Sequence, residues 1–261
     1  MSGVLERITA FERELFERLC TRMERCRFGT AYLHERFPRR WFSNFVWADA
    51  PLDGVSAHEL AEDADDVLGR AGLTHRVVLV DALAQAERLA SGMAGLGYRV
   101  DRNLVMVHAR EPDRGADRRA EELDLLSAKR FHERVSLESE EIDEVEGAGM
   151  LAEFREVLSE RVGARFFGAR VDGEVVSACE LYQLGQVAQI EDVATLEAHR
   201  DRGLARASVL AAVHAAREAG ADLIFLGADE EDWPQHLYRK LGFEVVGRSI
   251  DFVRKPERQR A

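Results

Sequence analysis

Apolar side chains recur at three- and four-residue intervals over residues 5–26. This interval matches one turn of an α-helix, so the pattern predicts an amphipathic helix there. Aromatic and β-branched residues then concentrate in two runs, 28–33 and 41–47, which predict strands. An acidic stretch follows, with Ser56 as a candidate N-cap and Gly72 as a candidate stop, and this predicts a second helix.

The rest of the chain alternates between short apolar runs and longer amphipathic stretches, which is typical of a mixed α/β protein. The predicted elements are a strand at 76–81, a helix at 84–95, strands at 104–108 and 129–137, a helix within 138–161, a hairpin of 165–171 and 174–183, a strand at 187–195, a helix at 204–219, one more strand, and a short helix ending in Leu-Gly-Phe at 241–243. The Asp172-Gly173 dipeptide inside the hairpin is a strong turn signal. We therefore expect an α/β fold, with an α+β mixed sheet.

Part of this pattern repeats. Residues 71–81 align with 219–229 at an offset of 148, and 96–98 align with 241–243 at an offset of 145. Because the two offsets are nearly equal, the alignment indicates an internal duplication, although two α/β units can also resemble each other without one.

A polar stretch divides the chain. Residues 111–127 are charged and contain Pro112 and Gly115, so we interpret them as a linker between a domain at 1–110 and a domain at 128–261.

Composition narrows the function. The formal net charge of −12 argues against a nucleic-acid partner. The 3 cysteines form no Cys-x-x-Cys pair, and no His-x-x-x-His pair has a matching acid, so we expect no metal. The first residues are charged and no apolar run reaches membrane-spanning length, so we expect a cytoplasmic protein with no membrane partner.

One loop carries the clearest chemical signal. Arg200-Asp201-Arg202-Gly203-Leu204-Ala205 joins a predicted strand to a predicted helix, and a Leu-Tyr-Arg-Lys-Leu-Gly-Phe segment follows at 237–243. Together they resemble the Arg/Gln-x-x-Gly-x-Gly/Ala loop and the tyrosine segment of the GNAT family of acetyl-CoA-dependent acyltransferases. The resemblance covers residues 129–254, while 5–110 look like a degenerate second copy. It implies tandem GNAT-like acyl-CoA N-acyltransferase domains, the second one catalytic.

Such a loop suits a pyrophosphate for general reasons. A helix that starts there presents unpaired NH groups and the positive end of its dipole, and Gly203 lets a phosphate approach the backbone. In the family resembled, the preceding strand offers NH groups to the acyl carbonyl and the pantetheine arm. The resemblance therefore implies that the residues contacting acetyl-CoA are Val193, Ala194, Thr195, Arg200, Asp201, Arg202, Gly203, Leu204, Ala205 and Arg206.

Tyr238 matches the tyrosine that acts in the family as general acid on the departing coenzyme A thiolate. A phenol suits this role because its reference pKa of about 10 keeps it protonated at pH 7. The alternative is that its ring only packs with Leu237 and Leu241. The family often has an asparagine about seven residues earlier, where this chain has an acidic stretch, and Asp232 there is a candidate cap for the short helix.

An amine acceptor also needs a base, because an amine with a pKa of about 10.4 is mostly protonated at pH 7. The candidates are Glu191, Asp192, Asp229 and Glu230. Strand alternation would place Glu191 and Asp192 on opposite faces, and we favour Glu191. The alternative for each acid is a solvated surface charge.

The predicted function is transfer of an acetyl group from acetyl-CoA, a co-substrate, to a primary amine of a small molecule or peptide, by direct attack in a ternary complex. Two alternatives stay open: a non-catalytic acyl-CoA-binding or regulatory protein, and an acetyltransferase for protein N-termini or lysines. The N-terminal copy is expected to complete the acceptor cleft. The oligomeric state is open, with a homodimer among the options.

Overall fold

The computed structural model describes residues 2–115, 119–138 and 145–256. Two compact units are built from non-contiguous stretches of the chain: one from residues 1–18, 105–228 and 232–246, the other from 19–104, 229–231 and 247–261. We call them the C-terminal unit and the N-terminal unit. The predicted linear division at 110 and 127 stays a prediction.

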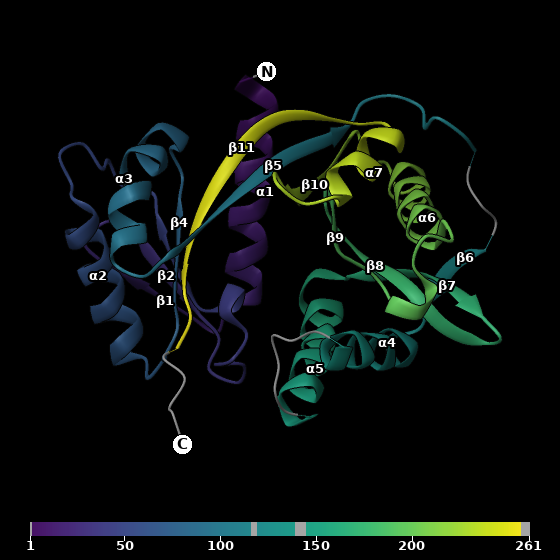
Figure 1. The fold of residues 1–261 in the computed structure, drawn as a ribbon, viewed down its shortest axis with the longest axis horizontal. Coiled ribbons are helices and arrows are strands. Elements are labelled where there is room, and N and C mark those ends of the chain that lie inside the picture. The colour runs from purple at the N-terminus through teal and green to yellow at the C-terminus, as the bar shows by residue number, and fades with distance from the viewer. Residues whose placement is uncertain (1, 116–118, 139–144, 257–261) are drawn as a thin grey trace. The chain divides into compact units, whose positions relative to one another are not determined.

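The N-terminal unit is a mixed sheet covered on one face by two helices (Figure 1). Its elements are β1 (Arg22–Arg25), β2 (Thr30–Leu33), the 3-10 turn Trp41–Ser43, β3 (Phe45–Ala48), α2 (Ala57–Arg70), β4 (Arg76–Val80), α3 (Leu83–Gly95) and parts of β5 (Arg99–His108) and β11 (Phe243–Arg254). The strand order is β1-β2-β3-β4-β11-β5. β3 and β4 are parallel, while β1–β2, β2–β3 and β4–β11 are antiparallel.

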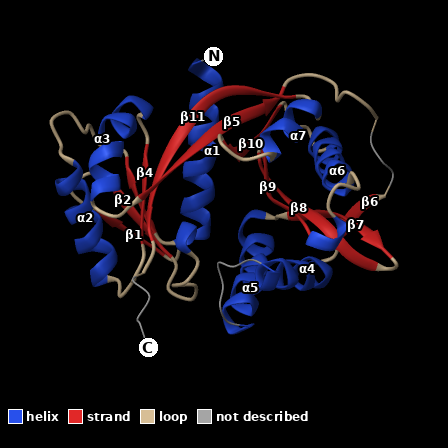
Figure 2. Ribbon diagram, viewed as in Figure 1, coloured by secondary structure: helices blue, strands red, loops and turns tan. Residues whose placement is uncertain are grey.

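The C-terminal unit is also a mixed sheet, with α6 and the α4–α5 pair packed on it (Figure 2). Its elements are α1 (Ser2–Leu19), β6 (Ala120–Leu123), α4 (Leu125–Glu138), α5 (Val145–Val162), β7 (Arg165–Val171), β8 (Glu174–Leu184), β9 (Val187–Thr195), the 3-10 turn Glu197–His199, α6 (Leu204–Glu218), β10 (Leu223–Asp229), α7 (Pro234–Lys240) and parts of β5 and β11. The strand order is β11-β5-β10-β9-β8-β7-β6. β9 and β10 are parallel, whereas β6–β7, β7–β8 and β8–β9 are antiparallel.

The two units share an order of elements that agrees with the predicted duplication. In each, a helix joins two adjacent parallel strands, β3–α2–β4 and β9–α6–β10. The aligned glycines also share a conformation: Gly72 and Gly220 have φ of 76° and 88°, and Gly97 and Gly242 have φ of 82° and 98°. Only glycine adopts such angles readily, so the alignment marks equivalent chain reversals.

Several predicted elements are confirmed. The Asp172-Gly173 hairpin joins β7 to β8, with both turn residues at positive φ. The strand predicted at 187–195 is β9, and the helices predicted at 84–95 and 204–219 are α3 and α6.

Other predictions were wrong. The N-terminal helix ends at Leu19, because residues 22–25 pair with β2 as β1. The stretch 129–137 is helix α4 rather than a strand, and its inward residues Ala128, Phe131 and His132 follow helical spacing. Within the proposed linker, whose role stays a prediction, Ala120–Leu123 form β6 and α4 begins at Leu125. Residues 41–43 are a 3-10 turn, and part of the helix expected within 138–161 lies outside the described residues.

The predicted start of α2 gives a direct test of local stability. Ser56 Oγ accepts from Glu59 N at 3.2 Å while Ser56 N donates to Glu59 Oε2 at 3.0 Å, a complete capping box. Ser56→Ala is expected to lower the free energy of unfolding by about 1 kcal/mol in chemical denaturation. Ser91→Ala, an exposed site inside α3, is the control and should be close to neutral. Equal losses in both variants would contradict the capping argument.

Candidate active site

A splayed pair of strands opens the sheet of the C-terminal unit. In the described part of the chain, β9 and β10 share register only from Val187 to Gln189. On its other side β9 stays paired with β8 as far as Thr195. The last residues of β9 therefore carry backbone groups directed away from β8 that have no partner in β10, and such groups are suited to pairing with an amide-bearing ligand. Val193, Ala194 and Thr195, the predicted contacts, lie on this stretch.

A β-bulge lies in the middle of β9. Ala178 pairs with Ala194 but Glu180 pairs with Glu191, so two β9 residues, Asp192 and 193, lie opposite one β8 residue. Asp192 has φ of 50°. Because the bulge interrupts the alternation of side chains, the prediction that Glu191 and Asp192 take opposite faces does not follow here. The bulge places Glu191 half-buried and Asp192 exposed.

The predicted loop leads directly into α6. Asp201 and Gly203 take left-handed conformations, with φ of 60° and 71°, and Gly203 is the residue before the helix. No side chain caps this helix start, and the space beside Gly203 is open, its closest atom to an added Cβ being Arg114 Nη2 at 3.9 Å. The loop thus offers the helix NH groups to an anion, with Leu204 and Ala205 in the first turn.

The three arginines of this region are not equivalent. Arg200 and Arg202 are exposed; Arg200 Nε donates to Thr195 O at 3.4 Å, and Arg202 Nη1 donates to His199 Nδ1 at 3.0 Å. Arg206 is buried and its Nη1 lies 2.7 Å from Asp113 Oδ1, an ion pair that lowers the pKa of Asp113. The charge of Arg206 is therefore already compensated by the predicted linker, a pairing that the sequence did not indicate.

Hydroxyl groups connect the end of β9 to α6. Thr195 Oγ1 donates to Ser177 Oγ at 2.9 Å, and Ser177 Oγ donates to Ala194 O at 3.0 Å. Ser208 Oγ, on α6, lies 3.5 Å from Ser177 Oγ and donates to Leu204 O at 3.2 Å. These contacts hold the splayed strand against the helix that follows the loop. Sequence reasoning missed Ser177 and Ser208 because isolated serines carry no motif.

Tyr238 lies in α7 and is buried, with its ring 6.2 Å from that of Phe243. Burial raises the pKa of Tyr238, and the negative charge of nearby Glu191 raises it further. The phenol therefore holds its proton at neutral pH. The suggested helix cap is wrong: Trp233 is the N-cap residue, no side chain caps the helix, and Asp232 accepts only from the adjacent Trp233 N, at 2.7 Å.

Glu191 is the best-placed of the predicted bases. Burial raises its pKa to about 7, with a further rise from Asp192, while a 2.6 Å hydrogen bond from Gln189 Nε2 opposes the shift. A carboxylate that titrates near neutral pH is matched to proton abstraction. By contrast, Glu230 Oε1 accepts from Arg248 at 2.9 Å, and Asp229 Oδ1 accepts from the NH of residue 231 at 2.8 Å. Glu191 is also close enough to Tyr238 for its charge to raise the pKa of the phenol, a proximity that the sequence could not indicate.

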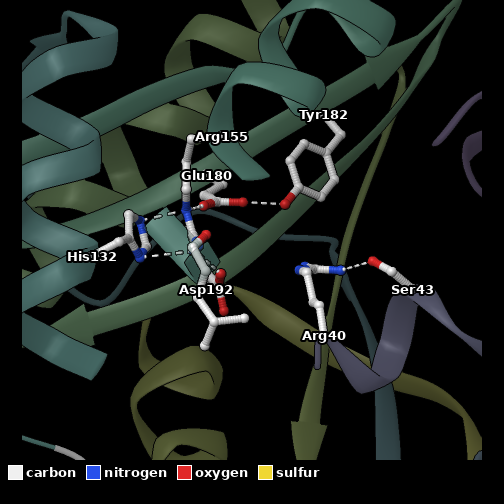
Figure 3. Close-up of polar contacts among 8 residues, drawn as sticks. Arg40, Ser43, His132, Arg155, Glu180, Tyr182 and Asp192 are labelled. Atoms are coloured by element: carbon white, nitrogen blue, oxygen red, sulfur yellow. Dashed lines mark hydrogen bonds and ion pairs between the residues drawn. The ribbon is translucent and has the colours of Figure 1, made fainter. Parts of the chain in front are cut away.

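A largely buried polar cluster, also missed by sequence reasoning, includes Asp192 of the β9 bulge (Figure 3). Its centre is Arg155 of α5, which donates to Glu180 Oε1 at 2.7 Å, to His132 Nδ1 at 2.9 Å and to Asp192 Oδ2. Tyr182 donates to the other oxygen of Glu180. We call these five residues the Arg155 cluster.

The Arg155 cluster includes three side chains, His132, Glu180 and Asp192, whose donor atoms lie within 4.8 Å of one another. That spacing suits a metal ion, but the Arg155 guanidinium already contacts all three. A bound arginine neutralises the carboxylates without a metal, so we interpret the group as an ion-pair cluster.

Comparison with known proteins identifies the fold. The sequence profile of the Acetyltransferase (GNAT) family matches residues 121–243, the stretch that contains the splayed strands, the loop and Tyr238. These residues form a GNAT domain. No match was found among curated protein sequences. In the described residues, no helix is long and apolar enough to cross a membrane.

Solved structures share the fold of this chain at low sequence identity. A GCN5-related N-acetyltransferase from Kribbella flavida aligns with a TM-score of 0.65 and 18% identity over 97% of this chain and 96% of its own. A functionally unknown conserved protein from Staphylococcus epidermidis ATCC 12228 aligns with a TM-score of 0.66 and 14% identity, over 87% of this chain and 91% of its own. A tandem GNAT protein from the clavulanic acid biosynthesis pathway aligns with a TM-score of 0.55 and 16% identity, over 87% of this chain and 78% of its own. The predicted GNAT resemblance and mixed α/β fold are confirmed.

Proposed function

We propose that the GNAT domain transfers an acetyl group from acetyl-CoA to a primary amine. The observation that carries this proposal is the electrostatic interaction between the buried phenol of Tyr238 and the half-buried carboxylate of Glu191, a residue of the splayed β9. The Tyr238 phenol holds its proton at neutral pH, whereas the Glu191 carboxyl titrates near neutral pH. Such a difference in pKa lets one group act as the acid and the other as the base in the same site.

In the proposed reaction the amine nitrogen attacks the thioester carbonyl carbon, a new C–N bond forms and the C–S bond breaks. Glu191 takes the proton that the amine loses, directly or through water, and Tyr238 gives a proton to the departing sulfur. Backbone NH groups of 193–195 stabilise the negative charge on the carbonyl oxygen as it becomes tetrahedral. The products are an N-acetyl amine and coenzyme A, and no metal takes part.

The loop before α6 is the proposed pyrophosphate site. Its left-handed Gly203 and the uncapped helix start fit an anion, and Arg200 and Arg202 are exposed beside it. Leu204 and Ala205 contribute backbone NH groups, and the left-handed conformation of Asp201 helps to form the turn of the loop. We assign Arg206 to support of the loop through Asp113 rather than to direct phosphate contact.

We also propose that the N-terminal unit descends from a second GNAT copy that cannot catalyse the same reaction. The position aligned with Tyr238 at an offset of 145 is Met93, which is fully buried in the core of that unit. A thioether cannot act as a general acid, so this copy has no proton donor at the equivalent place.

Calorimetric titration with acetyl-CoA tests the coenzyme site. Wild type should bind one equivalent, and an Arg200→Ala, Gly203→Glu double variant should show no measurable binding, because it removes a cation and places a carboxylate where the phosphate approaches. Arg165→Ala, which removes a surface arginine paired with Glu122, is the matched control and should bind normally. Two equivalents per chain would contradict the degenerate copy, and no binding by wild type would overturn the proposed function.

A further inference from the structure

Arg155 ties four elements of the C-terminal unit together. It is only 4% exposed, it starts from α5 and donates to Leu151 O at 2.8 Å in its own helix, and it reaches α4, β8 and β9 through the Arg155 cluster (Figure 3). An arginine buried to this degree must be fully paired, since an unpaired buried cation is very costly.

The pairing also determines the form of His132. Arginine can only donate, so His132 Nδ1 must accept the 2.9 Å bond and its proton must be on Nε2. That Nε2 lies 3.3 Å from Glu180 Oε1, and Tyr182 donates to Glu180 Oε2. Glu180 therefore accepts hydrogen bonds from Arg155 and Tyr182 and lies against His132, and these contacts fix the Arg155 guanidinium where it also reaches Asp192.

Asp192 occupies the bulge immediately after Glu191. Its φ of 50° is unusual for a residue other than glycine and costs free energy unless the surroundings hold it. The Arg155–Asp192 ion pair holds it, and about half of the Asp192 side chain remains exposed. We propose that Arg155 is a positioning residue that, through Glu180 and Asp192, holds the β9 bulge and controls the orientation and charge state of Glu191.

This inference rests on the proposed function, in which Glu191 is the base. Glu191 interacts with Glu180 from β8, with Gln189 and Asp192 from β9, and with Tyr238 from α7. Arg155 from α5 contacts both Glu180 and Asp192, and His132 from α4 contacts Arg155. The negative charges of Glu180 and Asp192 disfavour an ionised Glu191, and Arg155 is paired with both of these acids.

Removing the charge of Asp192 and removing the charge of Arg155 should therefore shift the pKa of Glu191 in opposite directions. Asp192→Asn removes a negative charge beside Glu191 and should lower its pKa by about one unit, whereas Arg155→Met leaves two acids uncompensated and should raise it by about one unit. If the pair had a purely structural role, both variants would loosen the same bulge, and the pKa of Glu191 would shift in the same direction in both.

The test is a carboxyl ¹³C NMR titration of the full chain labelled in glutamate, with Glu191→Gln to assign the resonance. Arg155→Lys, which keeps the charge, should restore a value near that of wild type. Arg165→Met, at a surface pair, should shift nothing. Should Arg155→Met fail to fold, the inference is still open to refutation, because Asp192 is half-exposed and an Asp192→Asn variant without a downward shift, or an Arg155→Lys variant far from the wild-type value, would contradict it.

Shifts in the same direction in both variants, or no shift in Asp192→Asn, would overturn the inference. The titration needs no substrate, so its outcome is separate from that of the proposed function. Opposite shifts in a protein that acetylates no amine would leave the Arg155 cluster in control of Glu191 and reject Glu191 as a catalytic base.

Discussion

Tyr238→Phe is expected to lower kcat by about 10²–10⁴-fold and to leave the Kd for acetyl-CoA unchanged. The substitution removes one hydroxyl group and keeps the ring, so the packing against Phe243 is retained. Because Tyr238 is buried, water has poor access to replace it as a proton donor. Steady-state turnover with an amine panel, together with calorimetric titration of the coenzyme, measures both quantities.

Tyr98→Phe is the matched control for this prediction. Tyr98 is also buried, and its hydroxyl makes no hydrogen bond within the described residues. Its loss should therefore change neither turnover nor coenzyme affinity. Full activity in Tyr238→Phe would remove Tyr238 from the mechanism and favour a different proton donor. Coenzyme binding without turnover of any amine by wild type would favour the non-catalytic acyl-CoA-binding alternative.

Gly242→Ala is expected to destabilise the protein by more than about 3 kcal/mol. Gly242 follows α7 with φ of 98°, and an added Cβ would lie 2.0 Å from Arg110 O. That carbonyl cannot move away easily, because Ala109 N and Arg110 N both donate to Gly242 O, at 3.0 and 3.2 Å. The free energy of unfolding from chemical denaturation measures the loss.

Gly220→Ala separates the two causes of this loss. Gly220 follows α6 in the same way and has φ of 88°, but nothing lies within 4 Å of an added Cβ. The variant should therefore lose only the cost of the left-handed conformation, about 1–2 kcal/mol. A loss in Gly242→Ala no larger than that in Gly220→Ala would mean that the backbone at Arg110 relaxes, contrary to the expected clash.

Local chemistry made much of the fold predictable. The Asp172-Gly173 turn, the Ser56 capping box and the glycine before α6 each depend on residues near one another in the chain, so their patterns are visible in the sequence. The prediction failed at 22–25 and 129–137, where short segments have no decisive period. There the partner strand or the packing surface decided the element.

The sequence by itself determined the GNAT character of 121–243 and supplied the loop before α6, Tyr238 and Glu191 as candidate site residues, because these follow from short motifs and from positions along the predicted elements. Only the tertiary structure decided that the charge of Glu191 acts on Tyr238, that Arg206 pairs with Asp113, and that Arg155 pairs with Asp192 at a bulge. The physical reason is that burial and ion pairing depend on which distant residues the fold brings together, and these contacts set the charge states of the site.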